Sequence, residues 1–173
     1  MMLPFIDSED DIYINLSIVL IIIKSLGKTS RGILKINNEK LHIFLYLIKN
    51  PTVLNILLRM SGKSTVFLND YDSYSVASIS PNFEPLFNGG DLKALLSILI
   101  AKKMVTVIYK KNSAFFYVLS GSGSSAEALL QDEYLKEVRL MCDKLKSVLS
   151  ISDSQLNQSL SQIIKKGISV NVE

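Results

Sequence analysis

Residues 60–65 contain a Gly-Lys-Ser triplet, which in nucleotide hydrolases ends the loop that binds phosphate. That loop carries another glycine five residues earlier, follows a strand and precedes a helix. Here Leu57 stands at that earlier position, the preceding residues have helical periodicity, and residues 65–68 are typical of a strand. Because the order is inverted, we interpret Gly62 as the glycine that closes a helix, with Lys63 beside the negative end of its dipole.

The inventory of reactive side chains opposes catalysis. Cys142 is the single cysteine and His42 the single histidine, so an internal disulfide, a multi-cysteine metal site and a histidine-based triad are excluded. Both residues lie in apolar surroundings, where packing is their usual role. The carboxylates of Glu9, Asp10 and Asp11 precede a predicted helix, whose dipole favours negative charge. We therefore expect no catalytic residue, no metal site and no cofactor.

Residues 11–26 predict a helix that is apolar on nearly all faces and closed by Gly27. The apolar run is shorter than the roughly 20 residues that span a membrane, and acidic rather than basic residues precede it. We expect a buried helix in a cytoplasmic protein without a membrane segment. It should be covered on more than one side, and a second chain is one plausible cover. Residues 1–11, with Pro4, predict an extended arm.

Further helices are predicted at 39–49, from Pro51 onward, at 92–103 and at 153–166. Short strands are suggested at 33–36, 65–68 and 74–79. Residues 105–110 and 114–119 alternate with a period of two around a turn at 111–113, which predicts a hairpin.

Ser124 and Glu127 match a capping box that would begin a long helix reaching residue 149. Apolar residues then recur at steps of three and four, which indicates a seam for a partner helix: Tyr134, Val138, Met141, Leu145 and Val148.

The predicted fold class is mostly α with a small β-hairpin, in the order of a winged helix. Its core would be helices 39–49, 51 onward and 92–103 with the hairpin, flanked by extra N- and C-terminal helices. The corresponding segments are 1–27 for the arm and apolar helix, 28–122 for the winged-helix core, and 123–173 for the C-terminal helices.

In a winged helix the helix before the hairpin enters the major groove of DNA. Its outward residues here would be Lys93, Ser97, Ile100 and Ala101, without the Arg, Asn or Gln side chains that read bases. Four lysines could still contact phosphates: Lys102, Lys103, Lys110 and Lys111. The alternative is that they are solvated lysines at a helix end and a turn, and the net charge of +3 does not decide between the two.

Three stretches carry a family resemblance: the opening Leu3-Pro4-Phe5, the helix DIYINLSIVLIIIKSL and the run LHIFLYLIKNPTVLNILL. With the hairpin AFFYVLSGSG and the stretch EALLQDEYLKEVRLMCDKL, the chain to about Leu149 resembles the middle components of bacterial ABC three-component systems. Such proteins are small winged-helix subunits encoded between an SMC-like or Rad50-like ABC ATPase and an effector. Within the group, the chain is similar to the small subunit of Lamassu-type anti-phage defence systems.

The resemblance implies a non-catalytic adaptor that joins the ATPase heads to a nuclease-type effector and restrains the effector until DNA is sensed. The alternative is a stand-alone winged-helix DNA-binding regulator, which would need base-reading residues on helix 92–103. For the adaptor, partner contacts are expected on the arm, the first helix and the seam, at Leu3, Phe5, Ile6, Tyr13, Tyr134, Val138 and Met141.

Overall fold

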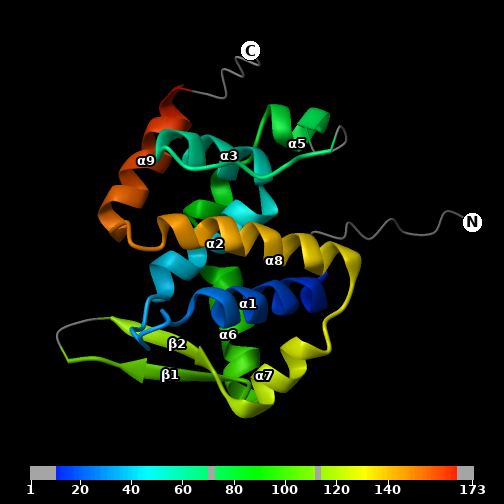
Figure 1. The fold of residues 1–173 in the computed structure, drawn as a ribbon, viewed down its shortest axis with the longest axis vertical. Coiled ribbons are helices and arrows are strands. Elements are labelled where there is room, and N and C mark those ends of the chain that lie inside the picture. Colours follow the sequence, from blue (N-terminus) through cyan, green and yellow to red (C-terminus); the bar gives the residue numbers. More distant parts are fainter. Residues whose placement is uncertain (1–10, 70–72, 112–113, 167–173) are drawn as a thin grey trace, which may run out of the picture.

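The computed structural model describes residues 11–69, 73–111 and 114–166 (Figure 1). The strongly apolar helix α1 (Ile12–Leu26) begins at Asp11, whose side chain accepts a hydrogen bond from the Tyr13 N–H (2.8 Å). It packs on several sides at once, against α2 (Asn38–Lys49), α6 (Gly90–Ala101), β2 (Phe115–Leu119), α7 (Gly121–Ala128) and α8 (Glu133–Leu145).

The cover that α1 demands is supplied by this chain. Residues 18–23 are each at most 5% exposed, and Leu26 is fully buried. A second chain is therefore not needed over this part of the helix, and the hydrophobicity of α1 is no evidence for one. The beginning of α1 is open, where Ile12 and Tyr13 are exposed, and Lys24 is exposed near its end.

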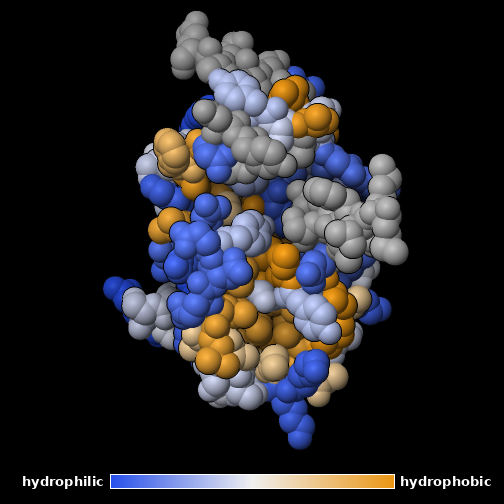
Figure 2. All heavy atoms as spheres, turned by 90° about the vertical axis from the view of Figure 1, so that its right-hand side faces the viewer, coloured by the Kyte–Doolittle hydropathy of each residue, from blue (hydrophilic) through white to orange (hydrophobic). Residues whose placement is uncertain are grey.

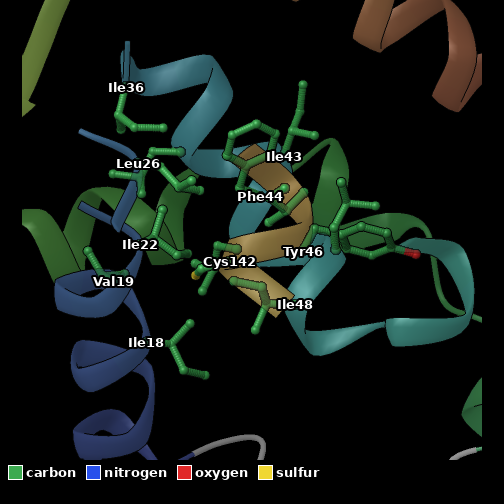
Figure 3. Close-up of a cluster of buried hydrophobic side chains, with 14 of the residues drawn as sticks. Ile18, Val19, Ile22, Leu26, Ile36, Ile43, Phe44, Tyr46, Ile48 and Cys142 are labelled. Carbon is green, nitrogen blue, oxygen red and sulfur yellow. The ribbon is translucent and has the colours of Figure 1, made fainter. Parts of the chain in front are cut away.

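A single hydrophobic cluster contains residues from each of the three predicted segments, 1–27, 28–122 and 123–173. Each large aliphatic side chain that is fully buried in it stabilises the fold by about 1.5–3 kcal/mol. Figure 3 shows part of this cluster, with side chains from α1, α2, α8 and the segment before α2, including Ile18, Val19, Ile22, Leu26, Ile36, Phe44, Ile48 and Cys142.

The end of α3 (Pro51–Met60) confirms the interpretation of the Gly-Lys-Ser triplet. Gly62 has a φ of +66°, and its N–H donates to the Arg59 carbonyl (3.0 Å). The Lys63 N–H donates to the Leu58 carbonyl (2.8 Å), which completes a Schellman closure of the helix. The strand expected at 65–68 is wrong, because this segment is irregular.

Within the described residues, no single helix is long and apolar enough to span a membrane. The helices α2 and α3 meet the length and composition criteria only as a pair, which bends by 116° at the break between them.

The strand expected at 74–79 is also wrong. Ser75 instead caps the short helix α5 (Val76–Ile79) by accepting a hydrogen bond from the Ser78 N–H (3.2 Å). The following turn η2 (Glu84–Leu86) is held against α2, where the Tyr46 hydroxyl donates to the Asn82 carbonyl (3.0 Å). Burial raises the pKa of Tyr46 above its ordinary value.

The predicted hairpin is confirmed, with β1 (Val105–Tyr109) antiparallel to β2 and Val105 opposite Leu119. The expected strand at 33–36 is reduced to isolated bridges. Asn37 pairs with Phe116, and the Tyr117 N–H donates to the Ile36 carbonyl (3.0 Å). The segment leaves the sheet there because the Asn37 side chain caps α2 one residue earlier than expected, accepting from the Lys40 N–H (2.8 Å).

The long helix expected from Ser124 to residue 149 is wrong. Ser120 caps α7 by accepting a hydrogen bond from the Gly123 N–H (3.1 Å), and a second helix, α8, begins after Asp132. Glu127 takes no part in a capping box and instead forms an ion pair between α7 and α8, with its Oε1 2.7 Å from Arg139 Nη2. The chain then continues through η3 (Lys146–Val148) to α9 (Asp153–Lys166).

The apolar seam on α8 faces inward. Val138, Leu145 and Val148 are fully buried and Met141 is 5% exposed. The helix that packs along α8 is α1 of the same chain, so the seam does not call for a partner helix. The fold class is confirmed as mostly helical with a two-stranded antiparallel hairpin among the described residues.

Gly123 allows α7 to pack closely against the backbone of Met104, the residue before β1. A Cβ at this position would lie 2.0 Å from the Met104 carbonyl oxygen, whereas a Cβ at Gly121 would meet nothing within 4 Å. We predict that Gly123→Ala lowers the free energy of unfolding by about 1–3 kcal/mol, because backbone must move to admit the methyl group. Thermal unfolding of Gly121→Ala, on the same helix, should match or slightly exceed the parent. Equal melting temperatures for the two variants would contradict this packing.

Candidate partner-binding groove

A groove of about 1060 Å³ opens on the side of the molecule where α1 begins. Its walls are the first half of α1, the bend between α2 and α3, residues 65–69 and one face of α8. Ile14, Ile18 and Met141 contribute apolar surface to it. Figure 2 shows this side of the molecule, where hydrophobic residues gather in the middle and lower part of the face between hydrophilic borders.

Large hydrophobic side chains stand exposed around the groove. Phe67 and Leu140 both line it and are 91% and 62% exposed, and Tyr134 lines it at 41%. Ile12 and Tyr13 at the start of α1 are exposed as well. Contiguous exposed apolar surface of this kind marks interaction sites in soluble proteins, whereas isolated apolar residues do not.

Asn55 of α3 positions the wall that carries Phe67. This side chain is 6% exposed, donates to the Val66 carbonyl (3.0 Å) and accepts from the Val66 N–H (2.8 Å). The amide thus replaces the strand partner that residues 65–68 lack. From the other wall, Lys144 Nζ of α8 donates to Ser64 Oγ (2.9 Å).

The polar rim of the groove carries both signs of charge. Carboxylates come from Asp132, Glu137 and Asp143, and amines from Lys49 and Lys144. An apolar floor within a charged rim is the arrangement of a protein-binding surface.

The surroundings of Cys142, His42 and Lys63 are those of residues with a structural role. Cys142 is fully buried, and burial is the main cause that raises the pKa of its thiol to about 12. His42 Nε2 lies 3.1 Å from the Leu86 carbonyl oxygen. Lys63 is exposed in the turn after α3. Across residues 11–69, 73–111 and 114–166, no group of three His, Cys, Asp or Glu side chains is placed to hold a metal ion.

Comparison with protein families identifies the family of this chain. The family described as ABC-three component (ABC-3C) system Middle Component 4 matches residues 26–158, which is more than half of the chain. The chain belongs to this family. No curated protein and no solved structure matches it. As a middle component, it is one part of a multi-component system, and the other components are its partners.

The residues that the sequence predicts for partner binding differ in how exposed they are in the structure. Tyr134 and Tyr13 are exposed at the groove and at the start of α1. Val138 is fully buried against α1, so its selection was wrong: the same spacing that suggested an interface belongs to the core. Met141 is almost as buried and contributes only to the groove floor. The three arm residues, Leu3, Phe5 and Ile6, lie outside the described residues.

Two groove residues of this middle component escaped the sequence reasoning. Leu140 lies off the three-and-four spacing of the α8 seam, next to Met141, and an apolar residue on the outer face of an amphipathic helix was the available signal. The composition of residues 65–68, which include Phe67, predicts a strand, and no local signal indicates that the Asn55 side chain binds this segment through Val66 instead.

The four lysines selected for phosphate contact are all exposed. Lys102 and Lys103 follow α6 and precede β1, while Lys110 and Lys111 follow β1 at the hairpin turn. The outward face expected for α6 is also exposed, with Lys93, Ser97, Ile100 and Ala101 on it.

We predict that Asn55→Ala loosens the wall of the groove. The substitution leaves the Val66 N–H and carbonyl without their partner, at a cost of about 1–3 kcal/mol. Amide hydrogen exchange should rise at residues 64–68 more than in α8, and the unfolding midpoint should fall. Gln162→Ala, which removes an exposed amide from α9, should change neither measurement. Unchanged protection of Val66 in Asn55→Ala would contradict this role.

Proposed function

We propose that this ABC-3C middle component is a non-catalytic adaptor that binds the ABC ATPase of its system through the groove between α1 and α8. The observation that carries the proposal is the groove itself, with exposed Phe67, Tyr134 and Leu140 around an apolar floor. The family supplies the kind of partner, because a middle component acts with the other components of its system.

The groove suits a helix or a loop of a partner protein. Aromatic and large apolar anchors supply most of the binding energy in such interfaces, and a charged rim sets orientation. The described chain offers both in one place, with aromatic rings at Phe67 and Tyr134 and carboxylates at Asp132 and Glu137. The apolar faces of α1 and α8 do not themselves call for a partner, because the fold of the chain already buries most of them.

The finer assignment follows the family resemblance. The ATPase is proposed to be SMC-like or Rad50-like, in a Lamassu-type anti-phage system. The adaptor would join its heads to a nuclease-type effector and restrain that effector until DNA is sensed. The arm residues Leu3, Phe5 and Ile6 are proposed as a second partner contact, since the chain enters α1 beside the groove at Asp11.

A winged-helix unit is part of the proposal, with a composition that differs from the one first expected. Its three helices would be α1, α2 and α6, followed by the hairpin, with residues 51–89 inserted between the second and the third. Two observations support this choice: α1 packs centrally against α2 and α6, and residues 36 and 37 pair with β2 as the first strand of such a unit would.

The alternative, a stand-alone DNA-binding regulator, finds less support. The exposed face of α6 carries Lys93, Ser97 and Ile100, and no side chain there pairs bidentately with a base.

Co-purification of the complete system tests the groove. Phe67→Ala and Leu140→Glu should each weaken ATPase binding at least tenfold, because loss of one anchor costs about 2 kcal/mol. The matched control is Phe87→Ala, since Phe87 is 78% exposed, follows η2 and does not line the groove. All three variants should keep the parent melting temperature.

Binding of Leu140→Glu at full strength, measured by titration of the isolated chain with the ATPase, would remove the groove from the proposal. Equal losses in Phe67→Ala and Phe87→Ala would show that the contact is not localised there.

A further inference from the structure

Charge is strongly segregated along this chain. Residues 24–38 and 92–126 contain nine of the 19 Lys and Arg residues and none of the 16 Asp and Glu residues. The rest carries ten basic residues against all 16 acidic ones. The net charge of +3 is therefore the sum of +9 on these two stretches and −6 on the rest of the chain. The nine are Lys24, Lys28, Arg31, Lys35, Lys93, Lys102, Lys103, Lys110 and Lys111.

The two basic stretches meet around the hairpin. The Asn37–Phe116 bridge and the hydrogen bond from the Tyr117 N–H to the Ile36 carbonyl join the first stretch to β2. The second stretch contains α6 and the hairpin itself. Of the nine cations, Lys35 is half-buried and the others are exposed. We call this region the basic lobe, defined by the described residues 24–38, 92–111 and 114–126.

The carboxylates that border the lobe in sequence are partly engaged elsewhere. Glu39 accepts a hydrogen bond from Asn157 of α9, and Glu127 pairs with Arg139 of α8. Asp91 lies in the first turn of α6, the same turn as Lys93 and at the far end of that helix from Lys102 and Lys103.

Exposed aromatic rings accompany the cations. Tyr109 and Phe115 face each other at the last register pair of the hairpin, with ring centroids 5.2 Å apart, and they are 63% and 55% exposed. Lys110 Nζ lies 5.8 Å from the centroid of the neighbouring Phe116 ring. A hydrophobic pair at an exposed turn gains little for folding, because most of its surface stays in water.

Lysines combined with open aromatic faces fit single-stranded nucleic acid better than an acidic protein. Lysines neutralise phosphates along the strand, and each unpaired base can stack on an aromatic ring. An acidic protein would use the charges and leave the rings without a function. Base-specific reading is not expected, because α6 exposes no side chain suited to it.

We propose that the basic lobe binds nucleic acid that has unpaired bases, with lysines on the phosphates and a base stacked against the Tyr109–Phe115 pair. The proposal goes beyond the adaptor function and does not depend on it. The groove is lined by the first half of α1, whereas the lobe includes the end of that helix from Lys24 onward, and no residue of the lobe lines the groove.

Fluorescence anisotropy of the full chain with a labelled 30-nucleotide single strand, and with the matching duplex, tests this. We expect binding of the single strand that weakens steeply with salt. Tyr109→Ala with Phe115→Ala should lower single-strand affinity about 5- to 150-fold and duplex affinity much less, since one stacked base contributes about 1–3 kcal/mol. Lys110→Gln with Lys111→Gln should weaken both and reduce the single-strand salt slope by about 1.4.

Matched controls separate local binding from overall charge. Lys165→Gln with Lys166→Gln removes two adjacent exposed lysines from the end of α9, and Tyr74→Ala removes a 70% exposed ring outside the lobe. Both should bind like the parent. Phe67→Ala and Leu140→Glu should also bind nucleic acid normally, so that failure of the groove and failure of the lobe remain distinguishable.

Three results would overturn the proposal. The first is no binding of the single strand at 50 mM salt. The second is an equal loss in the two double-lysine variants, which would indicate attraction by net charge alone. The third is concentration-dependent self-association in sedimentation that Lys110→Gln with Lys111→Gln abolishes, because the lobe would then face the acidic part of a second copy.

Discussion

The burial of α1 is the constraint on which the rest of the structure depends. A helix that is apolar on nearly all faces must be covered on several sides, and here five other elements of the chain pack against it. Helices α2 and α8, far apart in sequence, are brought together because both need the same partner. Once this packing is made, Ile14 in the first half of α1 and Leu140 on the outer face of α8 remain at the surface, and both line the groove.

Where a structural signal is local, the sequence was sufficient. Gly62 closes α3 because a positive φ is required at that position, and the alternation in residues 105–119 predicts the hairpin without knowledge of its neighbours. Where tertiary contacts determine the local structure, the prediction from sequence is wrong. Ser120 and Ser124 are both plausible caps, and the close approach of Gly123 to Met104 selects the first. Residues 74–79 have strand-like composition but no strand beside them in the structure.

The candidate groove also shows how far an interface can be predicted from sequence alone. Periodic apolar residues such as Val138 reveal that a helix face is buried, yet they do not say whether another chain or the same chain buries it. The informative residues were the exceptions to the period, Leu140 on α8 and Phe67 in an irregular segment. Neither residue can be assigned to a groove until the positions of α1 and Asn55 are known.

The ion pair between Glu127 and Arg139 has a consequence for how the molecule moves. It fastens α7 to α8 across the short link at residues 129–132, with two bonds from the guanidinium to Oε1 and one to the Glu127 carbonyl. Only Ser120 separates β2 from α7, so the ion pair also links α8 to the C-terminal side of the hairpin. We expect a displacement of α8 by a bound protein to pass through this pair to α7 and from there to β2.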